Sequence, residues 1–323
     1  MKFRTEITPE PLNAPIKMGE SLLSVGSCFS ELIAGNLAER KFAITINPTG
    51  VLFNPASIGQ SLGRWSRGEA FAEEEFHPSD ELWFHYELHG SLSRKTRHEA
   101  CEAANRALRT ASEALRRADR LLITFGTAWV YELGETGRMA ANCHRQPRSL
   151  FRRRLLSVEE IVSLWSALLD GPLRNKRLIM TLSPIRHLSD GAAENSLSKA
   201  TLRVALAELV NRYPQIDYFP AYELLTDDLR DYRFYGEDLV HPSAQAAAYI
   251  WEKFSAAALD PALQRLIVRL EALKRAREHR PLHAGSIEHN KFCMNQLQEI
   301  ERLERDFSID LEEEKAYFQA QIG

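Results

Sequence analysis

Short hydrophobic runs alternate with longer amphipathic segments through residues 1–257. The short runs have the length and composition of strands buried in a parallel sheet, and they lie at residues 22–25, 43–47, 120–125, 177–182 and 216–225. Apolar residues recur at helical spacing between and after them, at residues 29–41, 55–64, 97–118, 158–168, 195–212 and 242–258. This alternation predicts an α/β fold: a parallel sheet in three layers, with right-handed crossover connections.

Two segments interrupt the alternation. Residues 68–97 are rich in acidic and aromatic side chains, with every second residue apolar around residues 82–88. This pattern predicts an inserted hairpin, or a flap that covers the functional site of the domain. Residues 134–154 are too polar for a core and are expected to be a long irregular segment. That segment carries an arginine cluster made of Arg145, Arg148, Arg152, Arg153 and Arg154.

Residues 258–323 have no strand pattern, so we divide the chain into residues 1–257 and a C-terminal helical extension at 258–323. Two amphipathic helices and a shorter third are expected there, with a break at Arg280 and Pro281. Each helix has one apolar stripe to cover. These helices therefore pack either on the domain or on a second copy of the chain, which would form a homo-oligomer.

Composition excludes several classes of partner. The chain has 323 residues and a formal net charge of -3, which gives no general attraction to nucleic acid or to an anionic membrane. It has no apolar run long enough to span a bilayer, and its first residues lack the apolar core of a signal peptide. The four cysteines show neither CxxC nor zinc-finger spacing. We expect reduced thiols, a cytoplasmic location and no membrane partner.

Residues 22–34, LLSVGSCFSELIA, predict a strand that turns sharply at Gly26 into a helix. Ser27 and Cys28 would then lie at the positive end of the helix dipole, where free N–H groups lower the pKa of a thiol and can hold an oxyanion. Helix capping by Ser27 and simple burial of Cys28 explain the same pattern.

Asp238 precedes His241 by three residues, just ahead of a long helix. A carboxylate at this spacing can accept a hydrogen bond from one imidazole nitrogen and leave the other free as a base. By itself the D-x-x-H pattern is also compatible with capping of the helix.

The stretches GSCFS and DLVHPS together resemble the GSCFA family, which belongs among the SGNH/GDSL-like hydrolases. The resemblance extends to LITFGTAWVYE, ANCHRQP, TLSPIRH and YFPAYEL, and it covers roughly residues 20–256. It implies an SGNH/flavodoxin-like sheet and a nucleophile at the turn after the first strand.

The resemblance also implies roles for individual residues. Counting from Gly26 as in the G-D-S corner places Cys28 at the nucleophile and Ser27 where the Asp would be, and both stay open as nucleophiles. His241 would be the base, and Asp238 would orient it. The third block, G-x-N-D, corresponds to GTAW here, so Gly126 matches but the oxyanion asparagine is missing. Asn142 is the nearest candidate to replace it.

Three further residues, His144, Arg186 and His187, follow strand ends or lie in loops, where substrate-binding residues collect. Ordinary loop contacts are the alternative for the two histidines. The arginine cluster is either a solvated loop or a phosphate-binding surface, which makes acetyl-coenzyme A a candidate acyl donor. Asn195 reads as a helix cap, with Ser198 and Lys199 in the turn that follows. We expect no resident cofactor or metal, because the cysteines and histidines lack ligand spacing.

The function expected is that of an esterase or O-acyltransferase acting on a small-molecule or glycan acyl ester. A cysteine at this corner is also similar to SGNH-like acyltransferases with a G-N-C motif, so both transfer and hydrolysis stay open. The competing class is a catalytically inactive SGNH-like binding or assembly module, in which the missing asparagine marks lost catalysis.

Overall fold

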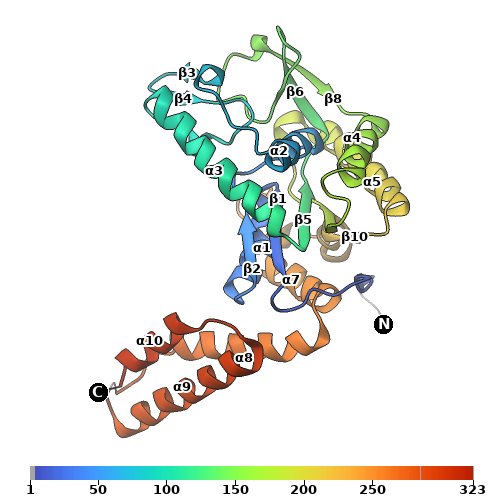
Figure 1. Ribbon diagram of the computed structural model, residues 1–323. Coiled ribbons are helices and arrows are strands. Elements are labelled where there is room, and N and C mark those ends of the chain that lie inside the picture. The colour runs from blue at the N-terminus through green and yellow to red at the C-terminus, as the bar shows by residue number, and fades with distance from the viewer. Residues whose placement is uncertain (1–3, 284, 323) are drawn as a thin grey trace.

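A five-stranded parallel sheet forms the centre of the computed structural model, which describes residues 4–283 and 285–322 (Figure 1). Its strands are β1 (Ser21–Gly26), β2 (Ala43–Ile46), β5 (Arg120–Phe125), β9 (Arg177–Leu182) and β10 (Ile216–Phe219). They are arranged in the order β2-β1-β5-β9-β10, and all neighbours are parallel. The order reverses between β1 and β5, and open α/β sheets bind ligands at the carboxyl ends of strands at such a point.

Helices cover both faces of this sheet, which confirms the predicted three layers. One face packs on α2 (Pro55–Arg67), α3 (Arg97–Arg117), α4 (Val158–Asp170) and α5 (Ala192–Arg212); the other packs on α1 (Cys28–Glu39) and α7 (Ala244–Ala258). Successive strand residues serve opposite faces: Leu23 joins the first core and Leu22 the second. Most strand residues that enter these two cores are therefore apolar, as expected for a sheet buried on both sides.

Two of these helices, α3 and α4, begin with a capping box. The Thr96 hydroxyl accepts a hydrogen bond from the Glu99 N–H, and the Glu99 carboxylate accepts one from the Thr96 N–H. Ser157 and Glu160 form the same reciprocal pair at the start of α4. Each pair satisfies amide donors that would otherwise lack a partner at a helix start.

The segment expected to be irregular, residues 134–154, contributes two strands to a second, antiparallel sheet, so that prediction was wrong. Its strands are β6 (Trp129–Leu133), β7 (Met139–Ala140) and β8 (Phe151–Leu155). Arginines form much of β8 because they have cross-strand partners: the Arg153 guanidinium lies 3.6 Å from the centre of the Trp129 ring, and Arg154 Nε donates to Glu132 at 2.7 Å.

The predicted strand at 216–225 is also too long. β10 ends at Phe219, and the chain turns at Pro220 into α6 (Ala221–Glu223) and a π-helical turn (Leu224–Leu229). Proline has no N–H to donate to a sheet, and its carbonyl instead accepts a hydrogen bond from the Leu224 N–H.

Residues 68–97 do contain a hairpin, formed by β3 (His77–Ser79) and β4 (Leu82–Phe84). It packs beside α3 (Figure 1). The loop before α3 reaches the loop that follows β2, because the His89 N–H donates to the Thr49 carbonyl. That this segment forms a flap over the site stays a prediction.

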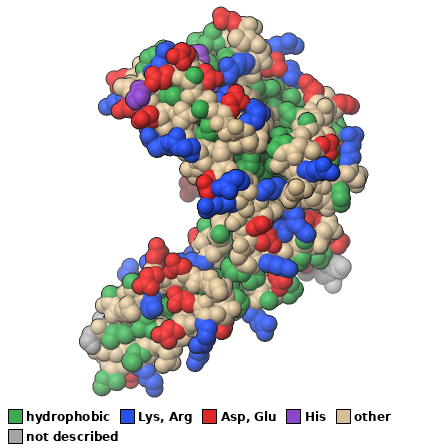
Figure 2. Space-filling view, viewed as in Figure 1, with side chains coloured by type: hydrophobic (Ala, Val, Ile, Leu, Met, Phe, Trp, Pro, Cys, Tyr) green, Lys and Arg blue, Asp and Glu red, His purple; other side chains and the backbone are tan. Residues whose placement is uncertain are grey.

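The chain ends in three helices: α8 (Pro261–Glu278), α9 (Ile287–Phe307) and α10 (Glu312–Ala320). They project from the α1 and α7 side of the body, and a hollow separates them from the rest of the molecule in Figure 2. Their apolar residues continue the core of that side. Across residues 4–283 and 285–322, no helix is both long and apolar enough to cross a membrane.

Candidate functional site

The turn from β1 into α1 is built around Gly26. Its φ is 154°, and a Cβ there would lie 2.4 Å from the Thr124 carbonyl oxygen on β5. Only glycine fits this close approach of two strand ends. The Gly26 N–H donates to Asn47 Oδ1 at 3.0 Å, and Asn47 Nδ2 donates to Ser30 Oγ at 3.1 Å. The residue after β2 thus braces the turn.

Cys28 is the first residue of α1, and Ser27 is its N-cap. The backbone N–H groups of Cys28 and Phe29 point toward the Cys28 sulfur and favour its thiolate. Burial disfavours the charged form more strongly, so the pKa of the Cys28 thiol is raised above its ordinary value near 9. In the free protein at neutral pH, Cys28 is therefore a thiol that needs a base.

His241 lies at the sulfur. Its Nε2 is 3.6 Å from Cys28 Sγ, and its Nδ1 is 2.6 Å from Asp238 Oδ2. A carboxylate only accepts, so the Asp238 contact places the imidazole proton on Nδ1 and leaves the Nε2 lone pair facing the thiol. Thiol, imidazole and carboxylate form a continuous chain, which is the arrangement of a nucleophile with its base and orienting group.

Asp238 is fixed by its own loop. Its Oδ1 accepts hydrogen bonds from the N–H groups of Val240 and His241, both at 2.9 Å. Those two bonds, and then the His241 side chain, lower the pKa of Asp238 to about 2. The carboxylate therefore stays ionised at every pH at which the protein would work. Leu239, which follows Asp238, adopts a left-handed φ of 56°. This conformation forms the turn that brings His241 back to Asp238.

With this geometry in view, the comparison with known families gives a match over most of the chain. The model of the GSCFA family matches residues 21–254. The chain belongs to the GSCFA family. A second model, described as the C-terminal domain of GSCFA domain proteins, matches residues 270–323. A search among curated proteins finds no match.

In this GSCFA chain Ser27 is placed differently from Cys28. Its side chain is 1% exposed, and within the part of the chain that the structure describes its Oγ has no hydrogen-bond partner. It makes no cap bond to α1. The predicted capping by Ser27 therefore concerns its backbone alone, and His241 contacts the thiol of the neighbouring residue.

Arg186 braces the loop that carries the histidine. Its guanidinium donates to the Leu239 carbonyl and lies 4.3 Å from the centre of the Tyr235 ring. Leu239 separates Asp238 from Val240, so this contact bears directly on the D-x-x-H turn. Arg186 thus stabilises the loop that carries His241. Contact of Arg186 with a substrate stays a prediction.

The two predicted oxyanion residues are engaged elsewhere. The Gly126 N–H donates to the Phe53 carbonyl at 2.7 Å. The Asn142 N–H donates to the Tyr86 carbonyl, and its Oδ1 accepts from the His144 N–H at 2.8 Å. Asn142 also lines a cavity of about 670 Å³ at the β3–β4 hairpin, and Cys28 is not part of that cavity. The donors closest to the sulfur are instead the amides at the start of α1.

The structure separates the two loop histidines. His187 lies at the corner: its Nε2 would be 3.3 Å from a Cβ on Gly126, and its ring meets Phe53 edge-on. His144 lies at the hairpin, where it stacks on Phe84 with ring centres 4.2 Å apart and contacts the His85 and Leu88 carbonyls through Nε2. Of the two, only His187 lies beside the turn after β5, and contact of either histidine with a substrate stays a prediction.

One helix contributes more to the site than the sequence suggested. α5 begins at Ala192 with Gly191 before it, so Asn195 is not its cap as expected. Asn195 Oδ1 accepts from the His187 N–H, and Ser198 Oγ accepts from the Ala128 N–H. Lys199 Nζ donates to the carbonyls of Gly126 and Ser183. The available signal was that these polar residues, at positions i, i+3 and i+4, continue the apolar stripe of the helix formed by Leu202, Leu206 and Leu209.

The cysteines and the arginine cluster are distributed over several elements of the structure. No group of three or more His, Cys, Asp and Glu side chains within residues 4–283 and 285–322 is arranged to hold a metal ion. All four cysteines are free thiols. The arginine cluster is divided: Arg153 and Arg154 hold β8 to β6, while Arg145, Arg148 and Arg152 are exposed.

Proposed function

We propose that this GSCFA chain is an SGNH-like acyl hydrolase or O-acyltransferase that uses Cys28 as its nucleophile. The observation that carries the proposal is the continuous contact from Cys28 Sγ through the His241 ring to Asp238, at 3.6 and 2.6 Å. Capping alone would require no contact between His241 and a residue on α1. The site also lies at the switch point of the sheet, as expected for a ligand site.

The chemistry follows from the proton positions. His241 Nε2 takes the Sγ proton as the sulfur bonds to the ester carbonyl carbon. The C–O bond then breaks, and the alcohol leaves with the proton from His241, so that a thioester remains on Cys28. Water or an acceptor hydroxyl gives its proton to His241 and attacks the thioester, which releases the acid or the new ester and restores the thiol.

The oxyanion would be held by the N–H groups of Cys28 and Phe29, because the Gly126 N–H is bound to Phe53. One such donor typically contributes about 3 kcal/mol to transition-state stabilisation. A substrate that displaces the Phe53 carbonyl would add the Gly126 donor.

A thiol nucleophile suits transfer from an acyl thioester such as acetyl-coenzyme A, and the exposed arginines offer charge for its phosphates. A small-molecule or glycan ester remains the proposed substrate class. Four free thiols are compatible with the proposed cytoplasmic location.

One observation favours the second candidate, an inactive binding or assembly module. Of the oxyanion donors inferred by resemblance, the Gly126 N–H is occupied and Asn142 is used within the hairpin. A chain that has lost catalysis could keep the Cys28, His241 and Asp238 contacts as packing.

Turnover separates the two candidates. The purified chain is assayed against activated acyl esters of increasing length and against acetyl-coenzyme A with sugar acceptors, beside Cys28→Ala, Ser27→Ala and His241→Ala. The proposal predicts turnover that Cys28→Ala and His241→Ala abolish and Ser27→Ala retains. Turnover that depends on Ser27 instead would identify Ser27 as the nucleophile. No turnover by the folded protein with any of these substrates would favour the binding module.

A further inference from the structure

Lys199 is a buried cation without a carboxylate partner. Its side chain is 2% exposed, yet within residues 4–283 and 285–322 no Asp or Glu oxygen lies within ion-pair distance of its Nζ. Its recorded partners are two neutral carbonyl oxygens, those of Gly126 and Ser183, both at 2.7 Å. Burying an ammonium group is costly, and two carbonyl dipoles offset that cost only in part. Packing alone therefore does not account for a lysine at this position.

The two carbonyls place Lys199 at the reactive corner. Gly126 follows β5 and Ser183 follows β9, so the ammonium joins two neighbouring strand ends at the carboxyl edge of the sheet. Gly126 in turn lies against Ser27, since a Cβ on Gly126 would be 3.2 Å from Ser27 Cβ. Lys199 thus approaches the turn from α5, whereas His241 approaches it from the loop before α7.

Charge links Lys199 to Cys28. Burial lowers the pKa of Lys199 to about 7, and a thiolate on Cys28 acts in the opposite direction. Conversely, the Lys199 charge lowers the pKa of Cys28, although burial of the thiol is the larger influence. The other groups that face the sulfur are Glu31 on α1, which disfavours the thiolate, and the His241 and Asp238 pair. His187 lies beside Gly126.

From this arrangement we infer that Lys199 is a positioning residue of the site: it fixes the ends of β5 and β9 and supplies the positive charge on the buried side of Cys28. The thiolate formed when His241 takes the Sγ proton would then lie between an imidazolium on the solvent side and an ammonium on the core side. The inference deepens the proposed function and relies on it for the role of the thiolate. The ionisation of Cys28 can nevertheless be measured without any acyl substrate.

The test is the pH dependence of Cys28 alkylation by iodoacetamide, followed by peptide-mapped mass spectrometry in the full chain. Lys199→Met removes the charge and keeps an apolar stem. At pH 6, where a lysine with a pKa of about 7 is mostly charged, we expect its alkylation to be about three to ten times slower than in the wild type, equivalent to a rise of half to one unit in the pKa of Cys28. Lys199→Arg keeps a charge and should alkylate faster than Lys199→Met.

Lys176→Met is the matched control. Lys176 also bridges two carbonyls, those of Arg116 and Ala118, but at the amino end of β9. Its loss should leave the alkylation profile of Cys28 unchanged. A folded Lys199→Met with the wild-type profile would overturn the inference.

If Lys199→Met does not fold, Lys199→Gln, which keeps a donor without a charge, takes its place. Failure of both to fold beside a folded Lys176→Met would assign Lys199 a structural role alone, which also overturns the inference. Failure of the proposed function has a different signature: the alkylation profile shifts as expected, but no acyl ester is turned over.

Discussion

At the residue scale, the site depends on a contact that no local pattern could establish, the one between His241 and Cys28. D-x-x-H predicted the Asp238 and His241 pair. The sequence gives no distance from His241 to Cys28, because the two residues lie 213 positions apart in the chain. Resemblance to a family supplied that pairing. It also suggested Gly126 and Asn142 as oxyanion donors; the backbone N–H of Gly126 is bound to the Phe53 carbonyl, while the role of the Asn142 side chain stays a prediction. Such partners depend on loop conformation and leave no trace in residue spacing.

Asp238→Asn tests the orienting role. The amide still accepts from the loop N–H groups but no longer requires the imidazole proton to be on Nδ1, so the base is lost while the turn persists. We expect acylation of Cys28 to slow by about 10²- to 10⁴-fold with little change in melting temperature. Asp231→Asn is the control, because Asp231 forms a similar turn with the Arg233 N–H. Equal losses in both variants would contradict the orienting role.

The pH dependence of Cys28 reactivity is a second test. Burial raises the pKa of this thiol above 9, so its thiolate is scarce at neutral pH and grows as pH rises through and beyond that value. The rate of alkylation should therefore keep increasing above pH 9 in the wild type. Because the pKa of Asp238 is lowered to about 2, its titration should add no inflection above pH 4. A plateau in the alkylation rate reached by pH 8 would contradict the raised pKa of Cys28.

At the scale of elements, periodicity predicted each strand of the parallel sheet and the long helices that pack on it, because the residues that form the two cores are mostly apolar. The failures have particular causes. β8 contains consecutive arginines, whose ring and ion-pair partners on β6 could not be inferred from one strand. β10 stops where Pro220 withdraws a donor from the ladder.

Two glycines of one strand–turn–helix unit should respond in opposite ways to alanine. Gly26→Ala places a Cβ 2.4 Å from the Thr124 carbonyl at a φ of 154°, and we expect a loss of about 1–3 kcal/mol in unfolding free energy. Gly35 lies within α1 with nothing within 4 Å of an added Cβ, so Gly35→Ala should stabilise by about 0.5–1 kcal/mol. Urea denaturation measures both. A neutral Gly26→Ala would show that β1 and β5 can separate at the turn.

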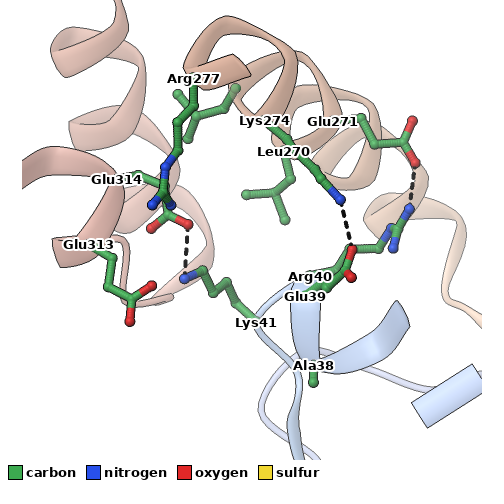
Figure 3. A pocket seen from close by; sticks show the side chains of 11 residues that line it. Ala38, Glu39, Arg40, Lys41, Leu270, Glu271, Lys274, Arg277, Glu313 and Glu314 are labelled. Atoms are coloured by element: carbon green, nitrogen blue, oxygen red, sulfur yellow. Dashed lines mark hydrogen bonds and ion pairs between the residues drawn. The ribbon is translucent and has the colours of Figure 1, made fainter. Parts of the chain in front are cut away.

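At the scale of the whole molecule, charged side chains join the C-terminal helices to the body. They surround a cavity of about 320 Å³ between the end of α1 and helices α8 and α10 (Figure 3). Lys41 pairs with Glu314 at 3.0 Å, and Arg40 pairs with Glu271 at 2.8 Å. The apolar core of α8 adds to this contact. The predicted alternative, docking of these helices on a second copy, stays a prediction.

Charge reversal tests whether the charged side chains around this cavity hold α10 in place. Lys41→Glu should increase hydrogen exchange in α10, and Lys41→Glu with Glu314→Lys should restore protection, with a coupling of about 0.2–1 kcal/mol. Reversal of Lys315, which lies on α10 outside the cavity lining, is the control. An unchanged exchange rate in Lys41→Glu would mean that the apolar contacts alone hold the helix.

The most direct test of the central claim is a covalent trap. The protein is exposed briefly to an activated acetyl ester and, separately, to acetyl-coenzyme A, then digested and mapped by mass spectrometry beside His241→Ala. The account predicts an acetyl group on Cys28 that is lost in His241→Ala, and labelling by acetyl-coenzyme A would favour transfer. An adduct on Ser27, or one on Cys28 that persists without His241, would contradict it.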